Sequence, residues 1–342
     1  MKHRGRIGIW LAAGIVVFGL LGAGRASAAG PADFLKIAPA THEAFLYLDV
    51  TQARQSKLYT DLKSQLFDQN TSAQLAAIEQ FTGVKLPDDI EAVAASGKIA
   101  TNNEGCLYLR GRCDRQRILG MFATNPGYAE ISKAGGKIIN YTDDKTGTLK
   151  SLSFLTDNLV VIGDSSAVEA ALAAFAGQGK TLDQNPAVKA QMAEIGASPT
   201  AMVIALRPQQ APPGLAEVPG LQNLQSLLLL LVDGSEAMTV IARVQADSVQ
   251  TAGKWLDIVR GVIAMGQIQN KFPKLTEIAN QVTASQRGSV VEVKAQLKVA
   301  DTGDFLRQRI AEGRAQRPNV GGRRVRGGGG KGPAEPATPP QW

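Results

Sequence analysis

Short apolar runs bounded by turn residues predict strands through most of the chain. In the first half these runs cover residues 44–50, 91–100, 105–112, 137–142, 149–155 and 159–163. The segments between neighbouring runs, at 101–104, 143–147 and 156–158, are rich in Asn, Asp, Thr and Gly. Because such segments form tight turns, neighbouring strands are predicted to pair as antiparallel hairpins.

Helical spacing of apolar residues predicts helices between the strand groups. The predicted helices cover residues 58–67, 73–81, 115–122 and 167–176. Asp114 and Asp164 stand just before the last two, where a side-chain oxygen would cap the first free N–H groups.

The second half repeats this order. Residues 198–206 parallel residues 40–48, and later elements are predicted at 227–232, 237–244, 248–270, 278–284, 290–299 and from Asp301 onward. Each half is a strand, a hairpin, a helix, a further hairpin and a terminal helix. This order predicts an α+β fold of two similar halves, 29–197 and 198–312, each with antiparallel strands and helices packed on one face. We interpret the repetition as an internal duplication; chance recurrence of a common hairpin–helix unit is the alternative.

The first 28 residues predict an export signal. Lys2, Arg4 and Arg6 precede an uncharged, mostly apolar stretch, and Ala26-Ser27-Ala28 supplies the small side chains that a signal peptidase accepts. Cleavage after Ala28 would leave an extracytoplasmic, periplasmic or secreted protein with no transmembrane span. The alternative is an uncleaved anchor, since about 18 apolar residues just span a bilayer.

Charge is concentrated at the two ends of the sequence. The net charge is +4 over residues 1–28, +5 over residues 313–342 and −2 over the rest, which argues against a nucleic-acid-binding core. Residues 313–342 are rich in Gly and Pro and are predicted to be a disordered tail. Within it, Arg323, Arg324, Arg326 and Lys331 are the predicted contact for polyanions, either acidic envelope polymers or anionic lipid headgroups.

Candidate chemistry is sparse. The only histidines are His3, in the signal, and His42, so a multi-histidine metal site is excluded; His42 is interpreted as a surface or strand-entry residue. Residues 175–181 resemble a phosphate-binding loop but follow a helix, which favours a C-cap. No catalytic, cofactor-binding or metal-binding residue and no cofactor is assigned.

Cysteines and acidic pairs have structural interpretations. Cys106 and Cys113 lie on one predicted strand too far apart for a disulfide, so both are predicted to be buried thiols. Asp88-Asp89 and Asp143-Asp144 fit capping and turns, although a two-acid hydrolase would also use such pairs. The run 227–231 fits a buried central strand better than a lipid-binding cleft.

Four segments carry a resemblance to a known group: 38–49, 83–90, 110–118 and 157–165. On them, the chain resembles uncharacterised exported bacterial proteins, classed as domains of unknown function, that are built from repeated strand–helix units. The resemblance covers roughly residues 38–310 and implies a fold but no activity or ligand.

From these observations we expect a non-enzymatic binding or scaffold protein of the bacterial envelope. Its partner would be an envelope protein, or an anionic polymer or lipid headgroup that contacts the tail. The alternative is a carboxylate-dependent hydrolase with its site between the two halves. The sequence predicts no specific nucleic-acid partner and leaves the oligomeric state open.

Overall fold

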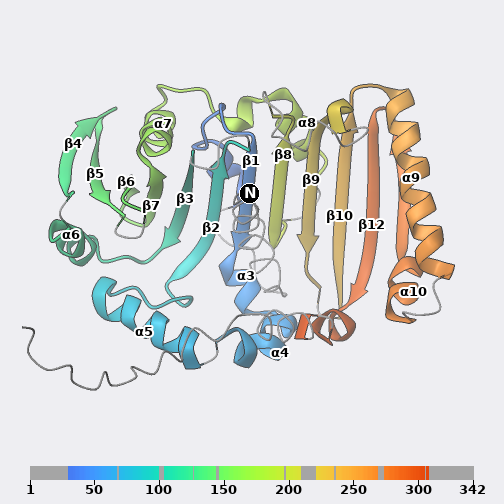
Figure 1. Cartoon of the computed structure of the whole chain (residues 1–342), viewed down its shortest axis with the longest axis horizontal. Coiled ribbons are helices and arrows are strands. Elements are labelled where there is room, and N and C mark those ends of the chain that lie inside the picture. The colour runs from blue at the N-terminus through green and yellow to red at the C-terminus, as the bar shows by residue number, and fades with distance from the viewer. Residues whose placement is uncertain are drawn as a thin grey trace, which may run out of the picture.

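One antiparallel sheet organises the molecule (Figure 1). The computed structural model describes residues 30–67, 69–99, 104–125, 127–143, 146–195, 198–208, 221–234, 236–268, 273–304 and 306–307. The predicted signal and tail, with Arg323, Arg324, Arg326 and Lys331, lie outside these residues. Within them the sheet has twelve strands in the order β11-β12-β10-β9-β8-β1-β2-β3-β7-β6-β5-β4.

The strands follow most of the predicted runs closely. Their bounds are β1 Ala44–Asp49, β2 Ile90–Gly97, β3 Gly105–Gly111, β4 Ala129–Lys133, β5 Gly136–Thr142, β6 Leu149–Thr156, β7 Leu159–Asp164, β8 Ala201–Leu206, β9 Leu224–Val232, β10 Ala237–Ala246, β11 Val282–Arg287 and β12 Val290–Lys298. The α+β class and the antiparallel pairing are thereby confirmed. The sequence analysis missed β4, a mostly polar and exposed strand at the sheet edge.

Helices connect and cover the strands. The α-helices are α2 Pro31–Leu35, α3 Val50–Arg54, α4 Lys57–Leu66, α5 Gln69–Thr82, α6 Arg115–Ala123, α7 Ser165–Phe175, α8 Pro186–Ala193, α9 Val249–Ile268 and α10 Pro273–Asn280. Two 3-10 helices, η1 Leu182–Gln184 and η2 Leu221–Asn223, are also present, and residues 299–304 after β12 are helical. None of the helices in the described part of the chain is long and apolar enough to span a membrane.

The sheet is continuous across the predicted boundary between the two halves. β1 pairs with β8, with Leu46 opposite Val203. In each half, the third strand in chain order pairs with the last one. β3 pairs with β7 in the first half, and β10 pairs with β12 in the second. We call the region from β3 to β4 the first end of the sheet and the region from β10 to β11 the second end.

The internal duplication stays a prediction. The two ends share a strand order, but the first end contains the additional strands β4 and β5. The alignment of residues 40–48 with 198–206 also fails in register. It matches Phe45 with Val203, yet Phe45 lies opposite Ile204, so Phe45 and Val203 occupy opposite faces of the sheet.

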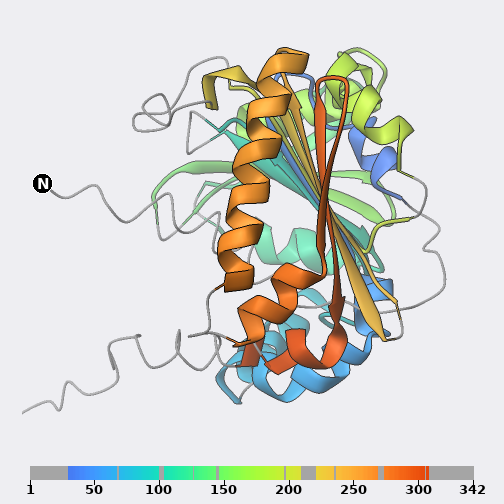
Figure 2. The ribbon, with the colours of Figure 1, turned by 90° about the vertical axis from the view of Figure 1, so that its right-hand side faces the viewer.

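Helices lie on both faces of the sheet, which corrects the expectation of a single covered face. On one face, here the α7 face, side chains of α2, α7 and α8 pack with Phe45, Tyr108 and Leu228. On the other, here the α9 face, α3, α4 and α6 pack with Leu48 and Ala201. At the second end, α9 covers the same side as α3 and α4; Figure 2 shows α9 in orange, standing to one side of the strands.

Both faces of the sheet need helices over them, because many strands carry apolar side chains that point alternately to one face and to the other. In β9, Leu228 and Leu230 enter the α7-face core, whereas Leu231 enters the α9-face core. A strand with apolar residues on both sides is stable only between two layers.

The helix caps agree with the sequence in part. Asp114 caps α6 by accepting a hydrogen bond from the Arg117 backbone N–H at 3.0 Å. Asp164 makes no such cap on α7; its carboxylate accepts the Gly105 N–H at 2.9 Å and pairs with Lys150 at 2.6 Å. It therefore ties β7 to β3 and β6. At the start of α9, the Ser248 hydroxyl accepts the Thr251 backbone N–H at 3.1 Å.

Candidate functional site

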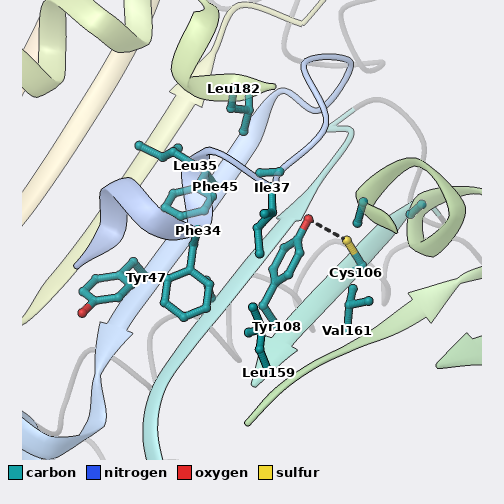
Figure 3. Packing of buried hydrophobic residues seen from close by; sticks show 14 of the residues in the cluster. Phe34, Leu35, Ile37, Phe45, Tyr47, Cys106, Tyr108, Leu159, Val161 and Leu182 are labelled. Carbon is teal, nitrogen blue, oxygen red and sulfur yellow. Dashed lines mark hydrogen bonds between the residues drawn. The ribbon is translucent and has the colours of Figure 1, made fainter. Parts of the chain in front are cut away.

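His42 belongs to a buried hydrogen-bonded cluster beneath the α7 face. Its Nδ1 lies 2.7 Å from Ser96 Oγ, which is also 3.1 Å from the Tyr108 hydroxyl. The Cys106 thiol donates to the same hydroxyl at 3.1 Å (Figure 3). Burial lowers the pKa of His42 to about 4 and raises the pKa of Cys106 to about 11.

This cluster is a satisfied part of the core. The Phe34 ring packs against Tyr47 and Tyr108, with centroids 5.7 and 6.3 Å apart. A neutral imidazole and a protonated thiol in such surroundings fill space and exchange hydrogen bonds. His42 thus stands at a strand entry, as predicted, but is buried.

The cysteines form no disulfide. Cys106 is buried, whereas Cys113 is half-buried and its thiol donates to the Asp157 carbonyl at 3.3 Å. The prediction of two buried thiols therefore holds only for Cys106.

The first acidic pair serves a turn. Asp88 pairs with Arg54 at 3.0 Å. Asp89 accepts the Lys85 backbone N–H at 2.8 Å and pairs with Arg112, and these contacts lower the pKa of Asp89. The two side chains brace the turn before β2, as their turn interpretation predicts. Asp144 of the second pair lies outside the described residues.

A hollow of about 310 Å³ opens on the α7 face at the second end. Its lining combines two guanidinium groups, two carboxylates, a hydroxyl and one apolar side chain, from Glu194, Arg243, Ser285, Arg287, Val290 and Glu292. Glu194 follows α8, in the predicted unit 29–197, and the other five belong to 198–312. The hollow therefore lies where the two units meet, the region expected to hold a site.

Arg243 is the centre of this hollow. It lies directly opposite Glu292 in the β10–β12 pair and its Nε donates to Glu292 Oε2 at 2.6 Å. Its Nη2 donates to the carbonyl of Glu194, the residue that follows α8, at 3.4 Å. Nη1 lies 3.7 Å from Glu194 Oε2 and, among the described residues, has no hydrogen-bond partner. The side chain thus joins α8 to the sheet and keeps one buried donor unsatisfied.

The two carboxylates of the hollow are both engaged by this guanidinium. A two-acid hydrolase needs one carboxyl as an acid and another free to attack or to activate water. The arrangement fits an ion-pair network better, and the hydrolase alternative stays a prediction. Among the described residues, no group of three or more His, Cys, Asp or Glu is placed to hold a metal ion.

The second feature of the site region is an exposed apolar stripe on α9. Ala252 and Leu256 pack on Val291 of β12 and form the buried side of the helix. Ile258, Val262 and Met265, in contrast, are 57%, 58% and 60% exposed. Their spacing of four and three residues places them on one side of the helix. We call these three residues the α9 stripe.

Exposed apolar surface is concentrated on this helix. Nine large apolar side chains are exposed in the described part of the chain, and five of them lie on α9. Trp255, three residues before Ile258, lies between the stripe and the sheet. It is partly buried and packs against the cluster that contains Ala252, Leu256 and Val291. Four of the five exposed side chains on α9, from Ile258 to Ile268, lie in the C-terminal part of the helix, which makes that part of α9 a candidate contact surface.

The neighbouring strands extend this apolar character. Leu227 and Leu229 lie opposite Val244 and Ala242, which in turn lie opposite Val291 and Val293. Directly opposed residues share a face, so both leucines are on the α9 face, and both are half-buried. The predicted buried strand is therefore correct for Leu228, Leu230 and Leu231 only.

Sequence analysis missed both features. It predicted an element over 248–270 but gave no role to the stripe, although the apolar residues of this segment cover an arc too wide for one buried side. Arg243 carries no sequence signal, because its partners Glu194 and Glu292 are each 49 residues away.

Comparison with known proteins gives a likeness in backbone only. No family model and no curated protein matches the chain. The Treponema protein TP0453 in crystal form III has a TM-score of 0.48 and 12% identity, covering 83% of this chain and 100% of that one. In crystal form IV the TM-score is 0.46, with 12% identity over 87% and 99%. A likeness at this level supports no statement about function.

Proposed function

We propose that this chain is a non-enzymatic, extracytoplasmic protein of the bacterial envelope that docks on anionic lipid surfaces. The α9 stripe carries the proposal. Three large apolar side chains on one side of a helix, each more than half exposed, are what an interfacial helix offers to a lipid layer.

Basic residues favour an anionic lipid surface over a second copy of the chain as the binding partner of the stripe. Lys254, one turn before Ile258, is exposed beside it. The predicted tail adds a net charge of +5, with Arg323, Arg324, Arg326 and Lys331 near its middle. A basic residue close to an anionic membrane contributes about 1 kcal/mol. The same charge would repel a second copy of the chain, which disfavours self-association through the stripe.

The predicted export signal places the mature protein where envelope lipids are found. Apolar contact and basic residues together give stable attachment, since each alone gives weak and reversible binding. In this proposal the stripe supplies the apolar part and the tail supplies the electrostatic part.

Vesicle flotation tests the proposal. The mature chain, from Ala29, is expected to float with phosphatidylglycerol–phosphatidylcholine vesicles and to remain unbound with phosphatidylcholine alone. Replacing Ile258, Val262 and Met265 together by Ser should lower partitioning at least about tenfold, because burying part of three such side chains is worth about 2 kcal/mol. Deleting 313–342 should weaken binding and reduce its dependence on salt.

A matched valine provides the control. Val249 is 60% exposed, like Val262 at 58%, but stands nine residues before Ile258 and so on the opposite side of α9. Val262→Asp should weaken flotation, and Val249→Asp should leave it unchanged. Equal effects of both, or unchanged flotation of the triple Ser variant, would refute docking through the stripe.

A further inference from the structure

The hollow around Arg243 lies on the α7 face, away from the α9 stripe, and has its own chemistry. We propose that it binds an uncharged sugar. The proposal is independent of lipid docking and rests on the unsatisfied donor, the charge balance and the size of the hollow.

The unsatisfied donor is the first argument. Arg243 is 8% exposed, and its Nη1 is buried without a hydrogen-bond partner among the described residues. The nearest carboxylate oxygen, Glu194 Oε2, is 3.7 Å away, beyond hydrogen-bond reach. A ligand oxygen that lies beside this pair, about 2.8 Å from each atom, would accept from Nη1 and donate to Oε2. A hydroxyl is both donor and acceptor, so it serves both atoms at once.

Charge balance is the second argument. The guanidinium groups of Arg243 and Arg287 match the carboxylates of Glu194 and Glu292 in number. A cationic or anionic ligand would meet a group of its own sign within a hollow of zero net charge. Neighbouring hydroxyls avoid that penalty, because they donate to the carboxylates and accept from the guanidinium groups.

The remaining lining suits the rest of a sugar. Ser285 and Arg287 lie opposite Glu292 and Val290 in the β11–β12 pair, which places their polar groups at the rim beside Arg243. Val290 offers an apolar surface for the C–H groups of a sugar ring. A volume of about 310 Å³ is at the lower end for small-ligand sites and suits one or two rings. Since no aromatic ring lines the hollow, we expect dissociation constants of about 1 mM.

Methyl NMR of the mature protein tests this inference. Glucose, galactose, mannose and N-acetylglucosamine are titrated separately while the Val290 methyl signals are followed. At least one of the four is expected to shift them saturably. Glucuronate and glucosamine, which carry one charge on a similar ring, should bind at least about tenfold more weakly than that sugar.

Paired variants separate the site from general effects. Glu194→Ala and Arg287→Ala remove polar groups from the rim, and each should weaken binding about tenfold. Glu277→Ala on α10 and Arg260→Ala on α9 remove exposed charges elsewhere and should change nothing. Circular dichroism confirms that each variant is folded.

Three results would overturn the inference: no Val290 shift with any of the four sugars, equal binding of the charged rings, or unchanged binding in both rim variants. None of them bears on vesicle flotation, so the lipid-docking proposal and the sugar proposal fail separately.

Discussion

The two ends of the sheet share a strand order but differ in their cover, because the first end has helices on both faces, α7 on the α7 face and α6 on the α9 face. At the first end α7 packs over β6 and β7 on the α7 face, where Val168 and Leu172 join the core. At the second end the helix over β10, β12 and β11 is α9, on the other face. The α7 face of the second end carries instead the hollow around Arg243.

This difference shows that the position of one helix decides which surface remains for contact. Under α7, the polar groups of Ser96, Cys106 and Tyr108 hydrogen-bond with one another. Arg110 Nε at the first end and Arg243 Nη1 at the second both lack a hydrogen-bond partner among the described residues, but only Arg243 lines the hollow, and only at the second end does the helix on the other face keep an apolar side open. Both candidate contact surfaces therefore lie at the second end of the sheet.

The largest expected effect compares one apolar side chain from each helix. Leu172 on α7 is buried, so Leu172→Ala should lower the free energy of unfolding by about 2–5 kcal/mol. Met265 on α9 is exposed, and Met265→Ala should change it by less than about 0.5 kcal/mol. Urea denaturation measures both. If Met265→Ala were as costly as Leu172→Ala, the stripe would be part of a packed core.

A smaller effect compares two titrating groups. His42 has a folded-state pKa of about 4 against an ordinary 6.5. The unfolded chain therefore takes up the proton first, and stability falls as pH drops from 6.5 through 4, by roughly 3 kcal/mol. The variant His42→Gln should lose this part of the acid sensitivity in urea denaturation at a series of pH values.

Asp233, in the turn between β9 and β10, should act in the opposite direction. Burial raises its pKa to about 6, so its protonated form favours folding, and this contribution is lost as pH rises through 6. Asp233→Asn should therefore be stabilised relative to the parent near neutral pH and equal to it near pH 4. If either variant changed stability with pH in the opposite direction, the side chain it replaces would not be buried as the structure has it.

The fold was predictable where local signals act alone. Asp114 caps α6 because its oxygen reaches the Arg117 N–H three residues on, a contact that the sequence encodes directly. Apolar runs such as 44–50 and 159–163 also became strands. Asp164 has the same sequence context as Asp114, yet its carboxylate binds Gly105 and Lys150; strand pairing brought these partners to it.

The candidate site was less predictable for the same reason. The hollow needs Glu194, Arg243 and Glu292 to meet, and only the order of β10, β12 and α8 brings them together. The choice of face is likewise a tertiary property: α9 has apolar residues on two sides, and packing decides which side is buried.

Quenching of Trp255 fluorescence tests lipid docking through α9 most directly. Trp255 adjoins the stripe, and in the mature chain with Trp342→Phe it is the only tryptophan. Phosphatidylglycerol vesicles with brominated acyl chains should quench its emission, and phosphatidylcholine vesicles with the same chains should not. Equal or absent quenching with the two lipids would contradict the proposal that α9 meets an anionic membrane.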